Sequence, residues 1–156
     1  RRQRQMCIRD SLGTEDRSFD FNYDALQTGR RTVSNMNADG VLQDRSAKLF
    51  RGTIDFQKGA AGSKGDEKED VLLLGEDVVN RTIPLILCAE EDVEGNHGAS
   101  IGQLDEDILF YMNSRGLSRA EAELLITHSK LEALCAKAND PGLTDRVHRY
   151  LEENAQ

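Results

Sequence analysis

The sequence predicts a mainly β domain followed by a small α-helical subdomain. Over residues 17–102, short apolar runs alternate with glycine-containing turns, which is typical of strands. From residue 105 onward the apolar residues recur with helical spacing. With 156 residues the chain is long enough to bury a core. We therefore divide it into residues 1–11, a β part over 12–103 and a helical part over 104–156.

Residues 1–11 differ in composition from the rest of this acidic chain. They hold four arginines and show no period that continues into the next segment. The run resembles a translated sequencing adapter, so we expect a non-native scar that gives Cys7 no functional weight. This interpretation also implies that a longer native N-terminal part is missing.

The β part begins with a clear alternation, because Phe19, Phe21 and Tyr23 are separated by polar residues. Short apolar runs follow at residues 41–42, 47–50, 54–56, 71–74 and 83–87. Pro84 is near the start of its run, a position that a strand tolerates. We expect residues 59–69 to loop out of the β part, because they are polar, charged and glycine-containing.

Two β architectures fit this pattern. Antiparallel strands in a sandwich would have turns of the same kind. A β-solenoid is also possible, because Phe50, Leu73 and Asn96 recur at a spacing of 23, comparable to the length of one coil. The pattern alone leaves both open.

The helical part carries recognisable caps. Asp105 is a candidate N-cap for a helix over 106–115, and Gly116 is suited to its end. The segment Ser118-Arg119-Ala120-Glu121 is a capping box that opens a second helix. Pro141-Gly142 breaks the pattern, and Thr144 is the candidate cap of a last helix.

Several function classes find no support in the sequence. It holds no Walker A, HExxH, GxSxG or CxxC motif. A net charge of −8 argues against nucleic-acid binding, and no apolar run is long enough to cross a membrane, so we expect a cytoplasmic protein. A carbohydrate-active enzyme is a remote alternative, because acids such as Asp66, Glu67 and Glu69 fall in runs that are typical of solvated turns.

His97 and Cys88 are the candidate metal ligands. An imidazole is largely neutral at pH 7 and binds many metals, while a thiolate suits iron and its clusters. His97 lies between Gly95 and Gly98, and Cys88 is in the preceding apolar run. From the residues alone, a lone histidine and a lone cysteine are more often structural than metal-ligating.

A set of motifs resembles the SufB/SufD family of iron–sulfur cluster assembly scaffolds. They are, in order, Thr28-Gly29-Arg30-Arg31, Phe50-Arg51-Gly52, the segment 58–63, Thr82-Ile83-Pro84, His97-Gly98-Ala99-Ser100, the segments 102–106 and 109–111, and Ser114-Arg115-Gly116-Leu117. The resemblance covers residues 28 to about 135. It implies the end coils of a right-handed parallel β-helix, followed by a C-terminal helical subdomain.

The resemblance also implies roles for single residues. Gly98 is typical of SufD, where SufB has glutamate, and His97 would match the histidine at the cluster site between SufB and SufD. Cys88 has a partial precedent in some SufB sequences. However, the position of the SufB cysteine falls near Glu69, and many SufD sequences have cysteine where this chain has Gly95. We expect the chain to share a transient cluster or iron with a partner and to bind neither tightly alone.

The implied protein is a non-enzymatic scaffold subunit. Its partners would be a SufC-like ABC ATPase and a SufB-like subunit or a second copy of itself. The helical part would receive the ATPase, with docking residues Ile108, Phe110, Tyr111, Met112 and Arg115. Leu109 completes an apolar run that covers more than one helix face, so we expect some of its members to be buried. The alternative is a β-helix interaction protein that has lost the cluster role.

Overall fold

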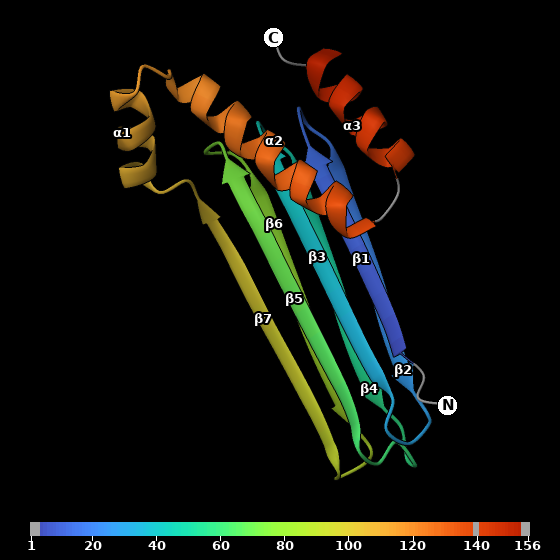
Figure 1. Cartoon of the computed structure of the whole chain (residues 1–156). Coiled ribbons are helices and arrows are strands. Elements are labelled where there is room, and N and C mark those ends of the chain that lie inside the picture. Colours follow the sequence, from blue (N-terminus) through green and yellow to red (C-terminus); the bar gives the residue numbers. More distant parts are fainter. Residues whose placement is uncertain (1–3, 139–140, 154–156) are drawn as a thin grey trace. The chain divides into compact units, whose positions relative to one another are not determined.

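A computed structural model describes residues 4–138 and 141–153, which form two compact units that divide after Gly102 (Figure 1). The first unit holds seven strands: β1 (Arg4–Gly13), β2 (Ser18–Gln27), β3 (Val33–Gln43), β4 (Ala47–Phe56), β5 (Ser63–Leu74), β6 (Val79–Cys88) and β7 (Val93–Gln103). The second holds three helices: α1 (Glu106–Ser114), α2 (Arg119–Ala138) and α3 (Pro141–Glu153).

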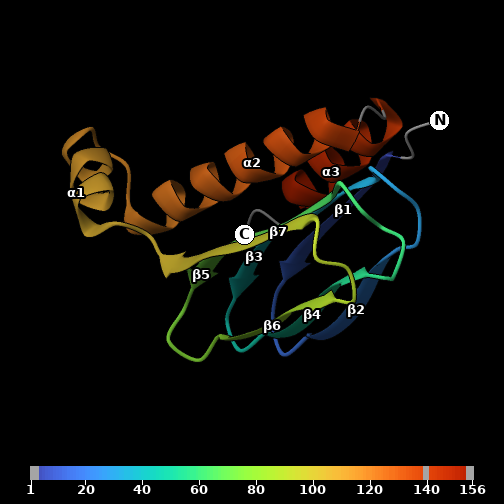
Figure 2. The same cartoon turned by 90° about the horizontal axis from the view of Figure 1, so that it is seen from below.

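The strands form a parallel β-helix of about three turns. Odd-numbered strands make one sheet in the order β1-β3-β5-β7, and even-numbered strands make the other in the order β2-β4-β6. Figures 1 and 2 show the two sheets facing each other, with their strands running in opposite directions. Because neighbours within each sheet are parallel, the predicted β-helix is confirmed and the antiparallel sandwich is wrong.

The coils are longer than the spacing of 23 indicated. Arg4 pairs with Val33, Val33 pairs with Lys64, and on the other sheet Ala47 pairs with Val79. One coil therefore takes roughly 30 residues, since each contains two strands of about ten residues and two turns. The spacing of 23 residues that suggested a solenoid is therefore not the length of one coil.

Residues 4–11, expected to be part of a scar, lie in β1. This strand pairs in register with β3 along its whole length, from Arg4 to Gly13. The β unit thus begins earlier than the expected boundary at residue 12. Whether these residues are native stays a prediction.

The expected loop over residues 59–69 is wrong. Only the turn before β5 leaves the coil path, and there Gly59 and Gly62 have positive φ values of 101° and 73°. From Ser63 the chain is a strand whose side chains alternate inward and outward. Pro84 is in the middle of β6 rather than near its start. A proline is tolerated there because β6 is an edge strand, which pairs on one side only.

The interior of the β unit holds both apolar and polar side chains. Phe50, Ile54 and Phe56 on β4 are fully buried. Ala25, Met36 and Ala60 pack with Ile54 and Phe56 in one cluster. Burial of these side chains removes apolar area from water and is the main stabilising contribution to the coil stack.

The helix starts follow the predicted caps, with one correction. The Asp105 side chain accepts a hydrogen bond from the Asp107 N–H, and Ser118 and Glu121 form the reciprocal bonds of a capping box. The last helix begins at Pro141 and not at Thr144, because a proline at the first helical position loses no intrahelical hydrogen bond. Among the described residues, no helix is long and apolar enough to cross a membrane.

Candidate functional site

His97 lies on the interior side of the last coil, yet its side chain is exposed. A Cβ atom at Gly95 would lie 2.9 Å from Ile86 Cγ2, so Gly95 faces the interior, and His97 faces the same way two residues later. In the described chain the odd-numbered sheet has one strand more than the even-numbered sheet, so the inner face of β7 is incompletely covered. His97 is therefore presented at the open end of the coil stack.

Cys88 is also exposed but lies at a different place. It ends β6, and β7 then runs back in the opposite direction (Figure 1). Gly95 is level with Ile86, since a Cβ at Gly95 would lie 2.9 Å from Ile86 Cγ2. His97 is further along β7 and so moves away from Cys88. Over the described residues, no group of three or more His, Cys, Asp or Glu side chains could hold a metal ion. The fold does not bring the two expected ligands together.

A polar cluster that is buried on β4 and β5 and half-buried on β6 lies inside the coils, and sequence reasoning missed it. We call it the polar core: Lys48, Glu67, Glu69, Asn80 and Thr82. Lys48 Nζ donates to Glu69 Oε1 at 2.9 Å, and both side chains are only 1% exposed. Thr82 Oγ1 donates to the other carboxylate oxygen of Glu69, and Asn80 Nδ2 is 3.4 Å from Oε1. These bonds compensate Glu69 for its loss of water.

Glu67 lacks such compensation. Its side chain is buried above Gly52, where an added Cβ would lie 2.4 Å from the carboxyl carbon. Glu67 Oε2 has no hydrogen-bond partner among the described residues. Burial, and then repulsion from Glu69, raises the pKa of Glu67 to about 7. At neutral pH this carboxyl group can therefore both hold and release a proton.

The missed residues carried a signal that could have located them. Val71 belongs to a predicted buried run, and the inward positions of a strand recur every second residue. Counting back from Val71 reaches Glu69, Glu67 and then Gly65, all of which are buried. The prediction failed because a run of charges was taken as a solvated turn.

Of the two positions where the family resemblance implies cysteines, Glu69 is buried inside the coils, while Gly95 faces the interior side of the last coil but is exposed. Glu69 is held by Lys48 in the polar core. At Gly95 a Cβ would also lie 3.1 Å from Phe56 Cε2, so a cysteine there would require neighbouring side chains to shift. A cysteine at Glu69 would remove the partner of Lys48, and one at Gly95 would disturb the packing against Phe56.

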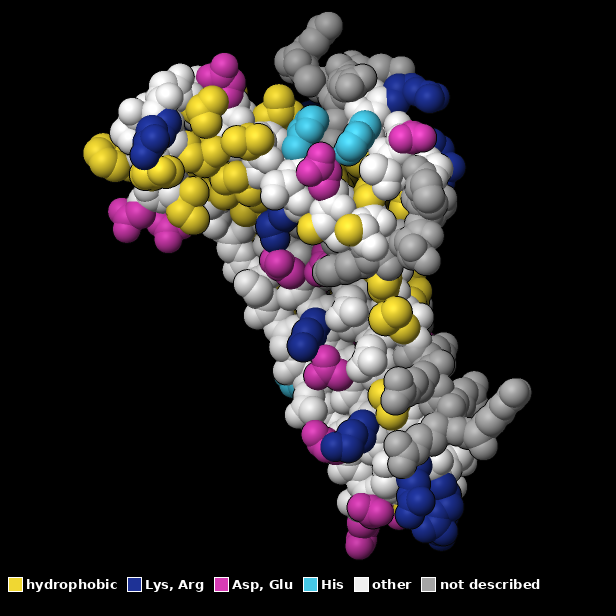
Figure 3. All heavy atoms as spheres, in the orientation of Figure 1, with side chains coloured by type: hydrophobic (Ala, Val, Ile, Leu, Met, Phe, Trp, Pro, Cys, Tyr) yellow, Lys and Arg dark blue, Asp and Glu magenta, His cyan; other side chains and the backbone are white. Residues whose placement is uncertain are grey.

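The predicted docking helix α1 exposes much of its apolar run. Phe110 is 75% exposed and Tyr111 57%, whereas Leu109 is 2% exposed. Ile108 is also exposed, Met112 is half-buried, and Arg115 lies over the Tyr111 ring at 5.0 Å. Figure 3 shows apolar side chains gathered over α1 and the beginning of α2, where Leu124 and Leu125 are exposed as well.

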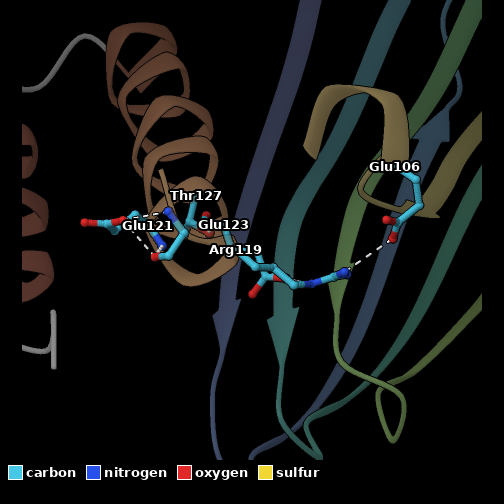
Figure 4. Close-up of polar contacts among 6 residues, drawn as sticks. Glu106, Arg119, Glu121, Glu123 and Thr127 are labelled. Carbon is cyan, nitrogen blue, oxygen red and sulfur yellow. Dashed lines mark hydrogen bonds and ion pairs between the residues drawn. The ribbon is translucent and has the colours of Figure 1, made fainter. Parts of the chain in front are cut away.

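Polar contacts join α1 to α2 (Figure 4). Arg119 Nε is 2.9 Å from Glu123 Oε1, and its Nη1 is 3.4 Å from Glu106 Oε1 on α1. Within α2, Thr127 Oγ1 donates to the Glu123 carbonyl oxygen. Exposed ion pairs of this kind add little stability but favour one arrangement of the two helices.

Comparison with known proteins places this geometry in context. Residues 9–130 match the family described as SUF system FeS cluster assembly, SufBD core domain. The iron–sulfur cluster assembly protein SufD of Bacillus subtilis (strain 168) is 28% identical over 93% of this chain and 33% of its own length. SufD of Escherichia coli (strain K12) is 28% identical over 69% of the chain and 25% of its own length.

A mycobacterial relative is slightly more similar. An iron–sulfur cluster assembly SufBD family protein of Mycobacterium tuberculosis (strain ATCC 25618 / H37Rv) is 33% identical over 77% of this chain and 14% of its own length. The chain thus spans a third or less of the length of these relatives.

Proposed function

The chain belongs to the SufBD core family of iron–sulfur cluster assembly proteins, and on that premise we propose that it acts as a SufD-like scaffold subunit. In this proposal it performs no catalysis itself. A SufC-like ATPase supplies ATP hydrolysis, and a SufB-like subunit or a second copy of the chain completes the cluster site in the cytoplasm. The cluster is the cargo of the complex.

The observation that carries the proposal is the placement of His97. It is exposed on β7, an edge strand that pairs on one side only within the described chain. A partner at this edge could bring further ligands to the imidazole without disturbing the coil interior. An iron–sulfur cluster generally takes four protein ligands, which the described residues of this chain do not gather at one place. The proposal therefore requires a partner that supplies the remaining cluster ligands.

A second candidate function is supported by the polar core. The position of the SufB cysteine falls near Glu69, which is bound to Lys48, and Gly95 leaves little room for the cysteine found in many SufD sequences. A scaffold that docks partners but gives no ligand would tolerate both changes. His97 is the residue that distinguishes the two functions.

Cys88 is not part of the proposed His97 site, because it lies at the end of β6, away from His97. It remains a separate exposed thiol, whose thiolate could bind iron.

The proposal is tested by assembling the complex. The chain is coexpressed with the SufB-like and SufC-like subunits of its own source, and subunit stoichiometry is measured by native mass spectrometry. Iron and acid-labile sulfide are then measured after anaerobic loading. We expect a complex that loads more cluster than the other two subunits alone. Equal loading with and without the chain would favour the docking-only scaffold, and absence of any complex would contradict both functions.

A further inference from the structure

The last strand of the β unit buries little beyond its first residues. Val93 packs on the apolar cluster that holds Phe56, and a Cβ at Gly95 would lie 2.9 Å from Ile86 Cγ2. Every residue of β7 after Val93 is exposed, whereas on β5 at least every second residue is buried. Figure 1 shows β7 at the edge of its sheet. The apolar burial that stabilises the inner coils therefore ends near Gly95.

Polar contacts attach the start of β7 to the neighbouring coil. The Gly62 N–H donates to the Asp92 carbonyl oxygen at 2.6 Å, and Lys64 forms an ion pair with Glu94. Both partners of this ion pair are more than half exposed, so the pair adds little stability. These contacts lie before His97 in the chain and fix the beginning of the strand rather than its continuation.

The glycines of β7 differ from those of the other strands. Earlier strands have glycine where an added Cβ would lie within 3 Å of a neighbouring side chain: Gly13, Gly40, Gly52 and Gly65. At Gly98 and Gly102 an added Cβ would meet nothing within 4 Å, and neither residue has a positive φ. Close packing thus requires glycine in the inner coils but not at these two positions. Here glycine weakens the strand, because its backbone gains more freedom when the strand is unpaired.

We propose that β7 beyond Gly95 is a detachable strand, which separates from β5 and returns while the coils before it stay folded. His97 belongs to this segment, so its imidazole is held in one place only while β7 is paired. A partner that covers the inner face of β7 binds the paired state and raises its population. Detachment thereby sets the fraction of chains whose His97 is available to a cluster site. This regulatory step rests on the proposed function, whereas the opening of β7 is a property of the chain alone.

The opening is tested by hydrogen–deuterium exchange of the full chain, measured by mass spectrometry of its peptides. The amides of residues 96–103 should exchange at least about 100-fold faster than those of residues 65–73 on β5, because local opening requires less free energy than global unfolding. Gly98→Ala/Gly102→Ala should slow exchange in β7 about 5- to 30-fold, since each alanine restricts the unpaired backbone. Exchange in β5 should stay as in wild type.

Gly29→Ala is the matched control for the double variant. Gly29 also has room for a Cβ, whose nearest neighbour would be Thr32 Cγ2 at 3.5 Å, but it lies between β2 and β3. This variant should leave exchange in β7 unchanged. Equal exchange of β7 and β5 in the wild-type chain would overturn the inference. Exchange in β7 that is as fast in the double variant as in wild type would overturn it as well.

A second measurement separates this inference from the proposed function. In the complex with the SufB-like and SufC-like subunits, residues 96–103 should become protected from exchange. A complex that loads cluster without this protection would overturn the regulatory step. If no complex forms while β7 of the free chain still opens locally, the proposed function fails and the detachable strand stands.

Discussion

At the scale of single residues, Lys48 and Glu69 explain how a charged segment became part of the β-helix interior. Two buried charges cost several kcal/mol each to dehydrate, and only close pairing with further hydrogen bonds offsets that cost. Here Thr82 and Asn80 on β6 donate further hydrogen bonds to the Glu69 carboxylate. The pair therefore contributes specificity to the coil register more than net stability.

Replacement of Lys48 by Met should be strongly destabilising, because it leaves the Glu69 carboxylate buried without a cation. We expect the free energy of unfolding to fall by about 3–5 kcal/mol in denaturant titrations. The double variant Lys48→Met/Glu69→Leu should recover most of the loss. Arg51→Met, which breaks the exposed pair with Asp20, is the control and should cost less than about 1 kcal/mol. A loss of similar size in Lys48→Met and Arg51→Met would show that the pair is not sequestered from water.

Glu67 should make the folded chain less stable as pH rises, whereas a carboxylate in an ion pair makes it less stable as pH falls. Its pKa is about 7 in the folded chain against an ordinary value of 4.5, so the folded state binds the proton more tightly. Its contribution is fully present below about pH 4.5 and is lost as pH rises through 7. The difference in unfolding free energy between wild type and Glu67→Gln should change by at most about 3 kcal/mol over this range. A difference independent of pH between 4.5 and 8 would be contrary to this account.

The sequence alone does not show which charged residues of 64–70 are buried, because burial depends on the register of β5. Alternation alone places Glu67 and Glu69 on one face, but charge gives no indication of which face is inside. The partner that makes burial possible, Lys48, is 21 residues away. His97 was identified because its motif resembles the family signature, whereas Glu67 belongs to no recognised motif.

At the scale of elements, the junction of α1 and α2 was the most predictable part of the chain. Asp105, Ser118 and Glu121 satisfy backbone groups at helix starts, and this chemistry depends on neighbours within three residues. The start of α3 was misplaced because Pro141 can either precede a helix or open it. The caps set the boundaries of α1 and α2, while the exposure of Phe110 and Tyr111 required the structure.

Phe110 should be an anchor for the SufC-like ATPase, because it is the most exposed of the large apolar side chains on α1. Phe110→Ala should weaken binding by about 2 kcal/mol or more, roughly thirtyfold in Kd by isothermal titration calorimetry. Leu85→Ala removes an apolar side chain from β6 that is 47% exposed, and it is the control for loss of exposed apolar surface away from α1. Unchanged affinity in a folded Phe110→Ala chain would place the docking surface elsewhere.

At the scale of the whole molecule, the β-helix and the helical subdomain were both predicted, but for different reasons. Local caps and helical periodicity indicated the second unit. For the first unit, apolar runs left sandwich and solenoid open, and the ordered family motifs decided between them. The coil length could not be predicted, because in a parallel fold each pairing joins residues about 30 positions apart and no local pattern records that separation.

The central claim is that this chain lends His97 to a cluster site completed by a partner, and iron loading of the assembled complex tests it most directly. His97→Ala should lower iron and acid-labile sulfide per complex, while the melting temperature stays nearly unchanged, because an exposed side chain contributes within about 0.5 kcal/mol. His148→Ala changes another exposed histidine and should load as wild type. Normal loading in a His97→Ala complex of wild-type stoichiometry would contradict the claim.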